Sequence, residues 1–202
     1  MKTKKKTHAV KTATAKLPTM YGEFIVTTYV SPDGREHMAL CMGNVDEKAI
    51  MTRIHSQCLT GDTFSSVRCD CGEQLHQSLK KISKEKRGIV LYLNQEGRSI
   101  GLSNKIKAYS LQDNGLDTVE ANHALGFPTD ARDYGIAADI LRDFGIKSII
   151  LLTNNPDKID QLTQHGIHVR KRLPLETKPN NSNKSYLITK KQKMQHYLTH
   201  ID

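Results

Sequence analysis

The sequence contains no tryptophan, and only 5% of its 202 residues are aromatic. A surface that binds nucleic acid by stacking bases on aromatic rings is therefore poorly supplied. No apolar run approaches 18 residues, so we expect no transmembrane helix. The first sixteen residues are basic, but they have neither the apolar segment of a secretory signal nor the arginines typical of a transit peptide. We therefore expect a cytoplasmic protein.

Acidic residues are scarce at both ends of the chain, although the formal net charge of the whole is +9. Residues 1–16 hold six lysines and no acid, and residues 166–202 hold eight basic residues against two acids, which leaves −3 for residues 17–165. A basic protein can bind nucleic acid, but charge runs at termini are usually solvated. We expect a basic N-terminal arm over 1–14, one folded domain over 15–175 and a polar, lysine-rich tail over 176–202.

The apolar pattern predicts an α/β fold. Two β-branched runs, GEFIVTTYV and EHMALCMGNV, flank the turn sequence SPDGRE and predict an antiparallel hairpin. Farther along, helical periodicities alternate with the buried strands IVLYLN and KSIILLT. We therefore predict a mixed sheet with flanking helices and an N-terminal antiparallel hairpin. The expected helices are EQLHQSLKKISKEKRG (ending at Gly88), LSNKIKAYSLQDNG, DTVEANHALGF, YGIAADILRDFG and DKIDQLTQHG, and IHVRKRLPL is the last strand.

Three of the four cysteines, Cys58, Cys69 and Cys71, lie within fourteen residues. In a reducing compartment such a cluster indicates a metal site or catalysis rather than a disulfide. Structural zinc sites use four protein ligands, whereas catalytic sites use three and leave a position for water. A closed site would need Cys41, inside an apolar run, or His55 as its fourth ligand, and this alternative stays open. The polar, turn-forming neighbours of the three cysteines favour the open site.

Two strand-end loops suit phosphate groups. In NQEGRSIGLSNK, glycines permit a close backbone approach and Arg98 can bind a phosphate through two hydrogen bonds. In LLTNNPDK, a helix start and Lys158 offer the same chemistry. The alternatives are a solvated arginine and an ordinary Asn cap followed by proline.

Three further side chains complete the candidate chemistry. Asp130 and Arg132 share the loop GFPTDARDYG, where they form either a functional pair or a surface ion pair of little energetic value. Tyr109 lies on a predicted helix, where it either packs or takes part in chemistry. A zinc that activates water, two phosphate-suited loops and an Asp/Arg pair together indicate metal-assisted hydrolysis of a nucleotide.

Three stretches closely resemble the GTP cyclohydrolase II family: RIHSQCLTGDTFSSVRCDCGEQL, NQEGRSIGLSNKIKAYSLQDNGLDTVEANHALGFPTDARDY and LLTNNPDK. The resemblance runs from Ala15 to Met194. It implies zinc-dependent hydrolysis of GTP to 2,5-diamino-6-ribosylamino-4(3H)-pyrimidinone 5′-phosphate, formate and pyrophosphate, the first committed step of riboflavin biosynthesis. It also implies the monofunctional form of the enzyme and a homodimer.

The same resemblance assigns roles to individual residues. It implies that Cys58, Cys69 and Cys71 bind one zinc per subunit, whose water attacks C8 of guanine. Tyr109 matches a tyrosine near that water. Arg132 matches a nucleophile toward the α-phosphate, and Asp130 matches its proton acceptor. Mg²⁺ is expected on the triphosphate. The implied GTP-binding positions are Arg53, Ile54, His55, Ser56, Gln57, Gln74, Glu96, Gly97, Arg98, Thr118, Thr153 and Lys158.

The chain departs from the family pattern at Gln57, where a glutamate is expected, and at Phe64 to Ser66, where a glycine-containing form is expected. Gln keeps the shape of Glu and loses its charge. Two rival functions stay open. One is a paralogue that opens the guanine ring but retains the formyl group or serves another pathway. The other is a non-catalytic zinc module that binds nucleic acid through its basic arms.

Overall fold

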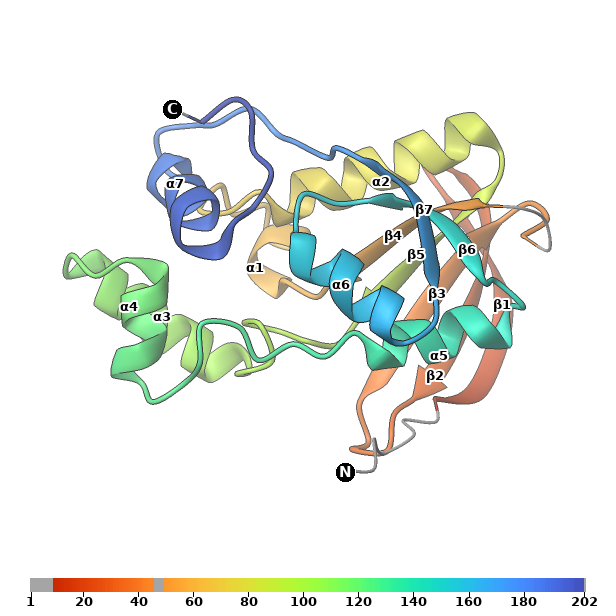
Figure 1. Cartoon of the computed structure of the whole chain (residues 1–202), viewed down its shortest axis with the longest axis horizontal. Helices are drawn as coiled ribbons and strands as arrows, with labels where there is room; N and C mark the ends of the chain where they lie inside the picture. The colour runs from red at the N-terminus through yellow and green to blue at the C-terminus, as the bar shows by residue number, and fades with distance from the viewer. Residues whose placement is uncertain (1–8, 46–48, 202) are drawn as a thin grey trace.

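A mixed seven-stranded sheet forms the centre of the computed structural model, which describes residues 9–45 and 49–201 (Figure 1). The strand order is β1-β2-β3-β5-β4-β6-β7. The strands are β1 (Val10–Thr19), β2 (Gly22–Val30), β3 (Glu36–Met42), β4 (Ile50–Ser56), β5 (Gly88–Leu93), β6 (Ser148–Leu152) and β7 (His168–Leu173).

The sheet is antiparallel in its first half and parallel in its second. β1, β2, β3 and β5 pair antiparallel, whereas β5, β4, β6 and β7 run parallel to one another. The predicted mixed sheet and its β2–β3 hairpin are confirmed. The sequence did not predict β1 or β4. Nearly all side chains of β1 are exposed, so it shows no apolar alternation, and β4 buries the polar residues Arg53 and His55.

Helices cover both faces of the sheet. Along β5, Leu91 points into the larger core with Ile140, while Val90 points to the opposite face and packs with Ile82. This alternation places α2 on one face and α5 with α6 on the other (Figure 1). The helices are α1 (Leu59–Asp62), α2 (Cys71–Glu85), α3 (Leu102–Asp113), α4 (Thr118–Ala124), α5 (Gly135–Asp143), α6 (Pro156–Gln164) and α7 (Lys184–Met194).

The end of α2 differs from the prediction. Lys86, rather than Gly88, adopts the left-handed conformation that closes the helix, with φ of 54°. Gly88 instead opens β5, where an added Cβ would lie 2.7 Å from the backbone oxygen of Met51. The glycine is therefore required by strand packing and not by helix termination.

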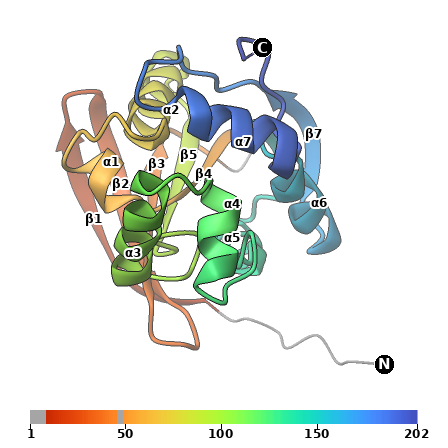
Figure 2. The ribbon, with the colours of Figure 1, turned by 90° about the vertical axis from the view of Figure 1, so that its left-hand side faces the viewer.

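A group of helices lies outside the sheet. α4 contacts both α3 and α7, and Figure 2 shows α7 lying above α4 with α2 and α6 at its two ends. α7 belongs to the segment from Glu176 that we expected to be a polar tail. That segment also buries Leu187, Leu198 and Ile201 together. The expected N-terminal arm lies largely outside the described residues, and the boundary drawn at residue 15 falls inside β1. Within the described part of the chain, no helix is long and apolar enough to cross a membrane.

The packing of α5 on the sheet allows us to predict how much the loss of a buried side chain lowers the free energy of unfolding. Ile140 is fully buried there, whereas Ile106 on α3 is 47% exposed. Ile140→Ala should lower the free energy of unfolding by about 2–5 kcal/mol. Ile106→Ala, the same change on another helix, should cost less than about 1 kcal/mol. Urea unfolding measures both values, and equal losses would contradict the burial of α5.

Candidate active site

Three parallel strands end at one edge of the sheet and place the candidate site there. β4 lies between β5 and β6 and runs parallel to both. The loops that follow these strands carry the Cys58, Glu96–Arg98 and Thr153–Asn155 segments. Ligands of open α/β sheets commonly bind beyond the carboxyl ends of such strands. Here these loops surround a hollow of about 1070 Å³, including the part open to solvent.

Most of the residues predicted from the sequence line this hollow. Ile54 does not, because its side chain is fully buried in the core. Its backbone oxygen instead accepts a hydrogen bond from Lys158 Nζ at 2.7 Å. Asp130 is also not a lining residue, but it binds Arg132, which is. The predicted residues that line the hollow are Arg53, His55, Ser56, Gln57, Cys58, Cys69, Cys71, Gln74, Glu96, Gly97, Arg98, Tyr109, Thr118, Arg132, Thr153 and Lys158.

The three cysteines converge at one side of the hollow. Cys58 directly precedes α1, Cys69 lies in the loop before α2, and Cys71 is the first residue of α2. Their sulfur atoms all lie within 4.8 Å of one another, with Cys58 Sγ and Cys69 Sγ 3.6 Å apart. A tetrahedral zinc with Zn–S bonds of about 2.3 Å separates its sulfur ligands by about 3.8 Å. The cluster therefore has the chemistry and the spacing that a zinc ion requires.

Two glycines allow the cysteine loops to approach each other. A Cβ added to Gly72 would lie 2.2 Å from the backbone oxygen of Gly61. A Cβ added to Gly61 would lie 3.0 Å from Cys69 Sγ and 3.2 Å from Cys58 Sγ. Both glycines are helical. The TGD segment lies within α1 and the DCGE segment starts α2, so both are close-packed helical segments rather than open turns.

The two alternative fourth ligands lie elsewhere. His55 Nε2 is 3.0 Å from both carboxylate oxygens of Asp62. Cys41 belongs to β3 and packs in the larger core. Within the described residues, the side chains around Cys58 that are close enough together to hold a metal ion number three, and all are cysteines. This count is that of a site with an open coordination position.

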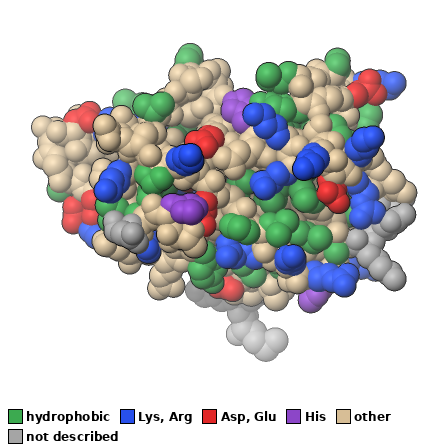
Figure 3. Space-filling model, turned by 90° about the horizontal axis from the view of Figure 1, so that it is seen from above, with side chains coloured by type: hydrophobic (Ala, Val, Ile, Leu, Met, Phe, Trp, Pro, Cys, Tyr) green, Lys and Arg blue, Asp and Glu red, His purple; other side chains and the backbone are tan. Residues whose placement is uncertain are grey.

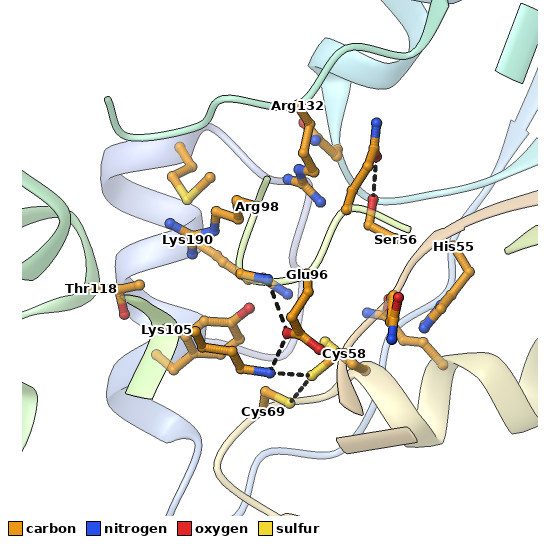
Figure 4. A pocket seen from close by; sticks show the side chains of 18 of the residues that line it. His55, Ser56, Cys58, Cys69, Glu96, Arg98, Lys105, Thr118, Arg132 and Lys190 are labelled. Carbon is orange, nitrogen blue, oxygen red and sulfur yellow. Dashed lines mark hydrogen bonds and ion pairs between the residues drawn. The ribbon is translucent and has the colours of Figure 1, made fainter. Parts of the chain in front are cut away.

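A buried lysine compensates the charge of the cluster. Lys105 Nζ, from α3, lies 3.1 Å from Cys58 Sγ and 2.8 Å from Glu96 Oε1 (Figure 4). Burial works against its charge, but Cys58 and Glu96 raise the pKa of Lys105 above its usual value. Hydrogen bonds with Cys69 and Cys71, together with Lys105, lower the pKa of the Cys58 thiol. Cys58 is therefore prepared to serve as a thiolate ligand.

Tyr109 lies one helical turn beyond Lys105 and faces the same cluster. Its hydroxyl is 3.5 Å from Thr60 Oγ1, which is itself 3.7 Å from Cys58 Sγ. The guanidinium of Arg68 stacks 4.4 Å from the Tyr109 ring centroid. Burial raises the pKa of Tyr109, so its hydroxyl keeps its proton at neutral pH.

Basic side chains also line the hollow. Arg132 donates to Asp130 from Nε and from its terminal nitrogen, the latter at 2.5 Å from Oδ2. Burial opposes ionisation, yet the Arg132 charge and its hydrogen bonds hold the pKa of Asp130 below its usual value. Burial and the charges of Arg53 and Arg132 push the pKa of Lys158 well below its usual value. An anion placed among these cations would relieve their mutual repulsion.

The loop after β5 is held in an unusual conformation. Gly97, Arg98 and Ser99 all have positive φ angles, of 60°, 58° and 72°. For the two residues with side chains this is a strained backbone, which persists where the surrounding structure enforces it and is common at functional sites. The turn directs Arg98 toward Thr129, whose backbone oxygen accepts a hydrogen bond from Arg98 at 3.2 Å.

Several lining residues were not found from the sequence. Lys105 ends the stretch NQEGRSIGLSNK but was assigned no role from the sequence, and the residues after 176 were assigned to a tail. Outside the hollow, the face seen in Figure 3 shows Lys and Arg scattered, with acidic side chains among them. That pattern is typical of a solvated surface. Asn154 and Asn155, in the helix start that the sequence indicated, also line the hollow. The lining residues that the sequence did not indicate are Arg68, Gln95, Ile100, Lys105, Ala108, Gln112, Asn122, Tyr186, Lys190, Met194 and His196.

Comparison with known proteins gives consistent matches. The family description GTP cyclohydrolase II matches residues 10–174. GTP cyclohydrolase-2 of Histophilus somni is 50% identical over 190 residues, which cover 93% of this chain and 88% of that protein. The riboflavin biosynthesis protein RibBA of Chlorobium phaeovibrioides is 54% identical over 185 residues, covering 91% of this chain and 45% of that protein. The chain thus spans about half the length of the RibBA relatives it matches.

A solved structure is also similar. The crystal structure of RibBX, a two-domain 3,4-dihydroxy-2-butanone 4-phosphate synthase from A. baumannii, matches with a TM-score of 0.48 and 19% sequence identity. The match covers 84% of this chain and 40% of that one.

The close contact between Gly61 and Gly72 predicts the effect of Gly72→Ala on stability, where helix propensity and steric collision oppose each other. Alanine normally stabilises a helix relative to glycine by about 1 kcal/mol, but at Gly72 its Cβ would collide with a backbone atom. We expect Gly72→Ala to lower the free energy of unfolding by about 1–3 kcal/mol and to reduce bound metal. Gly135→Ala, at the start of α5, meets only side-chain atoms of Asp133 and His165 and should be close to neutral. Elemental analysis and urea unfolding measure both; full metal retention in Gly72→Ala would refute the steric argument.

Proposed function

The chain belongs to the GTP cyclohydrolase II family of GTP hydrolases, and from this premise we propose that it converts GTP to 2,5-diamino-6-ribosylamino-4(3H)-pyrimidinone 5′-phosphate, formate and pyrophosphate. This reaction is the first committed step of riboflavin biosynthesis. The observation that carries the proposal is that the three thiols, Arg132 and Lys158 all line one hollow. A guanine ring at the thiols and phosphates at the cations would occupy it together.

We propose that Cys58, Cys69 and Cys71 hold one zinc ion per subunit. When bound, zinc supplies the Lewis acidity that activates water for hydrolysis. Lys105 offsets the charge of the thiolates and keeps Glu96 in place through its 2.8 Å ion pair. Tyr109, with its proton retained, can donate a proton to a leaving nitrogen of the opened ring. Mg²⁺ bound to the triphosphate would neutralise charge on the departing pyrophosphate.

The proposed chemistry at phosphorus belongs to Arg132 and Asp130. For the Arg132 guanidinium to attack the α-phosphorus, it must lose a proton as the N–P bond forms and the bond to pyrophosphate breaks. Arginine is almost always protonated, so a base must accept that proton. Asp130 Oδ2 lies 2.5 Å from the terminal nitrogen of Arg132 and is ionised. It is therefore positioned to take the proton during the attack. Water must then cleave the N–P bond, which releases the 5′-phosphate and restores Arg132.

The remaining predicted residues are proposed to bind GTP. Gln74 Oε1 accepts a hydrogen bond from Arg53 at 2.8 Å, so the two side chains hold each other in place in the lining of the hollow. Ile54 contributes through its backbone oxygen, which orients Lys158. We further propose a homodimer located in the cytoplasm, where thiol ligands remain reduced. The proposed binding positions are Arg53, Ile54, His55, Ser56, Gln57, Gln74, Glu96, Gly97, Arg98, Thr118, Thr153 and Lys158, within a catalytic domain over 15–175.

Product analysis tests the proposed reaction. The zinc-loaded protein with GTP and Mg²⁺ should release formate, pyrophosphate and the diaminopyrimidine in equal amounts. Asp130→Asn should lower kcat by about 10²–10⁴-fold, the usual contribution of a general base. Asp133→Asn, in the same loop but 71% exposed, should retain activity. A product that keeps its formyl group by mass spectrometry, or no turnover at all, would contradict the proposal.

Metal content tests the ligand assignment. We expect about one zinc per chain in the wild type, because three thiolates form an open site. Cys58→Ser, Cys69→Ser and Cys71→Ser should each lose most of it, since serine is a poor zinc ligand. Cys41→Ser should keep its zinc, although burial of a hydroxyl at a position only 7% exposed should cost stability. Loss of zinc from Cys41→Ser would indicate a closed, four-ligand site.

A further inference from the structure

The segment after β7 returns to the hollow and contributes to its wall. Tyr186, Lys190, Met194 and His196 all line it, and no motif or family position assigns them a role. α7 is fixed above the site by ion pairs to two other helices. Lys190 Nζ lies 2.7 Å from Asp70 Oδ1, in a pair whose side chains are 10% and 2% exposed. Lys193 pairs with Asp117 and with Glu120 on α4.

The turn that ends α7 fixes the position of His196. Gln195 adopts the left-handed conformation, with φ of 57°, and the backbone N–H of His196 donates to the Lys190 oxygen at 3.0 Å. The next residue, Tyr197, donates its N–H to the backbone oxygen of Asn154 at 2.8 Å. The Asn154 side chain also binds the backbone N–H and oxygen of Leu175. His196 is thus held between two anchored residues, against the loop that carries Thr153 and leads into α6, on which Lys158 lies.

His196 lacks a partner for one ring nitrogen. Its Nε2 is buried and makes no hydrogen bond with any described residue. A buried polar atom without a partner costs about 1–3 kcal/mol, which makes such atoms rare in folded proteins. Because His196 lines the hollow, the missing hydrogen-bond partner of its Nε2 indicates that a bound ligand supplies one.

The charges around His196 define the chemistry of that ligand. Burial lowers the pKa of His196 to about 2, and the positive charges of Lys190, Arg132, Lys158 and Arg98 contribute in the same direction. All four of these cations line the hollow. An uncharged imidazole in such a field can donate a hydrogen bond to an anionic oxygen, and the anion would gain from every cation around it.

We propose that His196 is a substrate-binding residue whose Nε2 donates a hydrogen bond to the polyphosphate of the nucleotide. Lys190 is a positioning residue that holds α7, and therefore His196, over the site through Asp70. This inference rests on the proposed function for the identity of the nucleotide. Its chemical content, a polyphosphate contact made by the C-terminal segment, is independent of the reaction that follows.

Substitutions at His196 separate its hydrogen bond from its bulk. Glutamine places an N–H group close to the position of Nε2, whereas asparagine and alanine do not. His196→Ala and His196→Asn should raise the KM for GTP, and the dissociation constant of inorganic tripolyphosphate measured by calorimetry, by about tenfold or more. His196→Gln should stay within about threefold of the wild type. His200→Ala, in the same segment but exposed, is the matched control and should change neither value.

Guanosine, which has no phosphate, separates a direct contact from a general disturbance. Under the proposal its inhibition constant is unchanged in all His196 variants. The proposal is overturned if tripolyphosphate affinity in His196→Ala stays within twofold of the wild type, or if guanosine and tripolyphosphate weaken equally. Should His196→Ala unfold, the Asn and Gln variants make the same comparison. Should the wild type fail to turn over GTP, the proposed function fails, while tripolyphosphate binding still decides the role of His196.

Discussion

The whole site depends on β4 being paired in parallel on both sides. Because β4 lies between β5 and β6, three consecutive loops converge at its carboxyl end. Hydrogen bonds across the edge then fix the loops: Gln57 N–H donates to the Leu93 oxygen at 2.8 Å, and Arg53 donates to the Leu152 oxygen at 3.0 Å. The side chain of Lys158 returns to the Ile54 oxygen. The backbone of β4 thus fixes the positions of the thiols, the strained Glu96–Ser99 turn and the cations relative to one another.

The lining of the hollow carries charged groups of both signs. Lys105 contacts the Cys58 sulfur and the Glu96 carboxylate. Arg132 pairs with Asp130, and Lys190 pairs with Asp70, while Arg98 and Lys158 add further positive charge to the lining. A buried charge without a partner is costly, so each cluster carries its own counter-charge. Burial, together with the excess of cations that remains in the lining, lowers the pKa of Lys158 and of His196. A polyanion is the ligand that would restore neutrality there.

The sequence predicted those parts whose signal is local. The hairpin, the buried strands β5 and β6 and the convergence of the cysteines all follow from short patterns. β1 and β4 were missed because their stability comes from pairing with neighbours rather than from apolar alternation. Lys105 was missed because a lysine within a helix resembles a solvated one until its neighbours are known. The role of α7 was missed for a related reason: its lysines read as a tail, yet Lys190 and Lys193 find acidic partners 120 and 76 residues away. Ion pairs between residues so far apart in the sequence cannot be recognised from a local sequence pattern.

These long separations have a consequence for how the chain acquires its structure. The thiol cluster is complete within residues 58–71, early in synthesis, but the carbonyl that holds Arg53 is 99 residues farther on and the ammonium that pairs with Asp70 is 120 residues from it. Contacts between distant residues form slowly, because the entropy of loop closure must be overcome first. The hollow therefore closes only after the last helix has been synthesised, and Asp70 stays without its partner until then. Arg53 and Asp70, in the N-terminal half of the site, thus wait for partners that are synthesised much later.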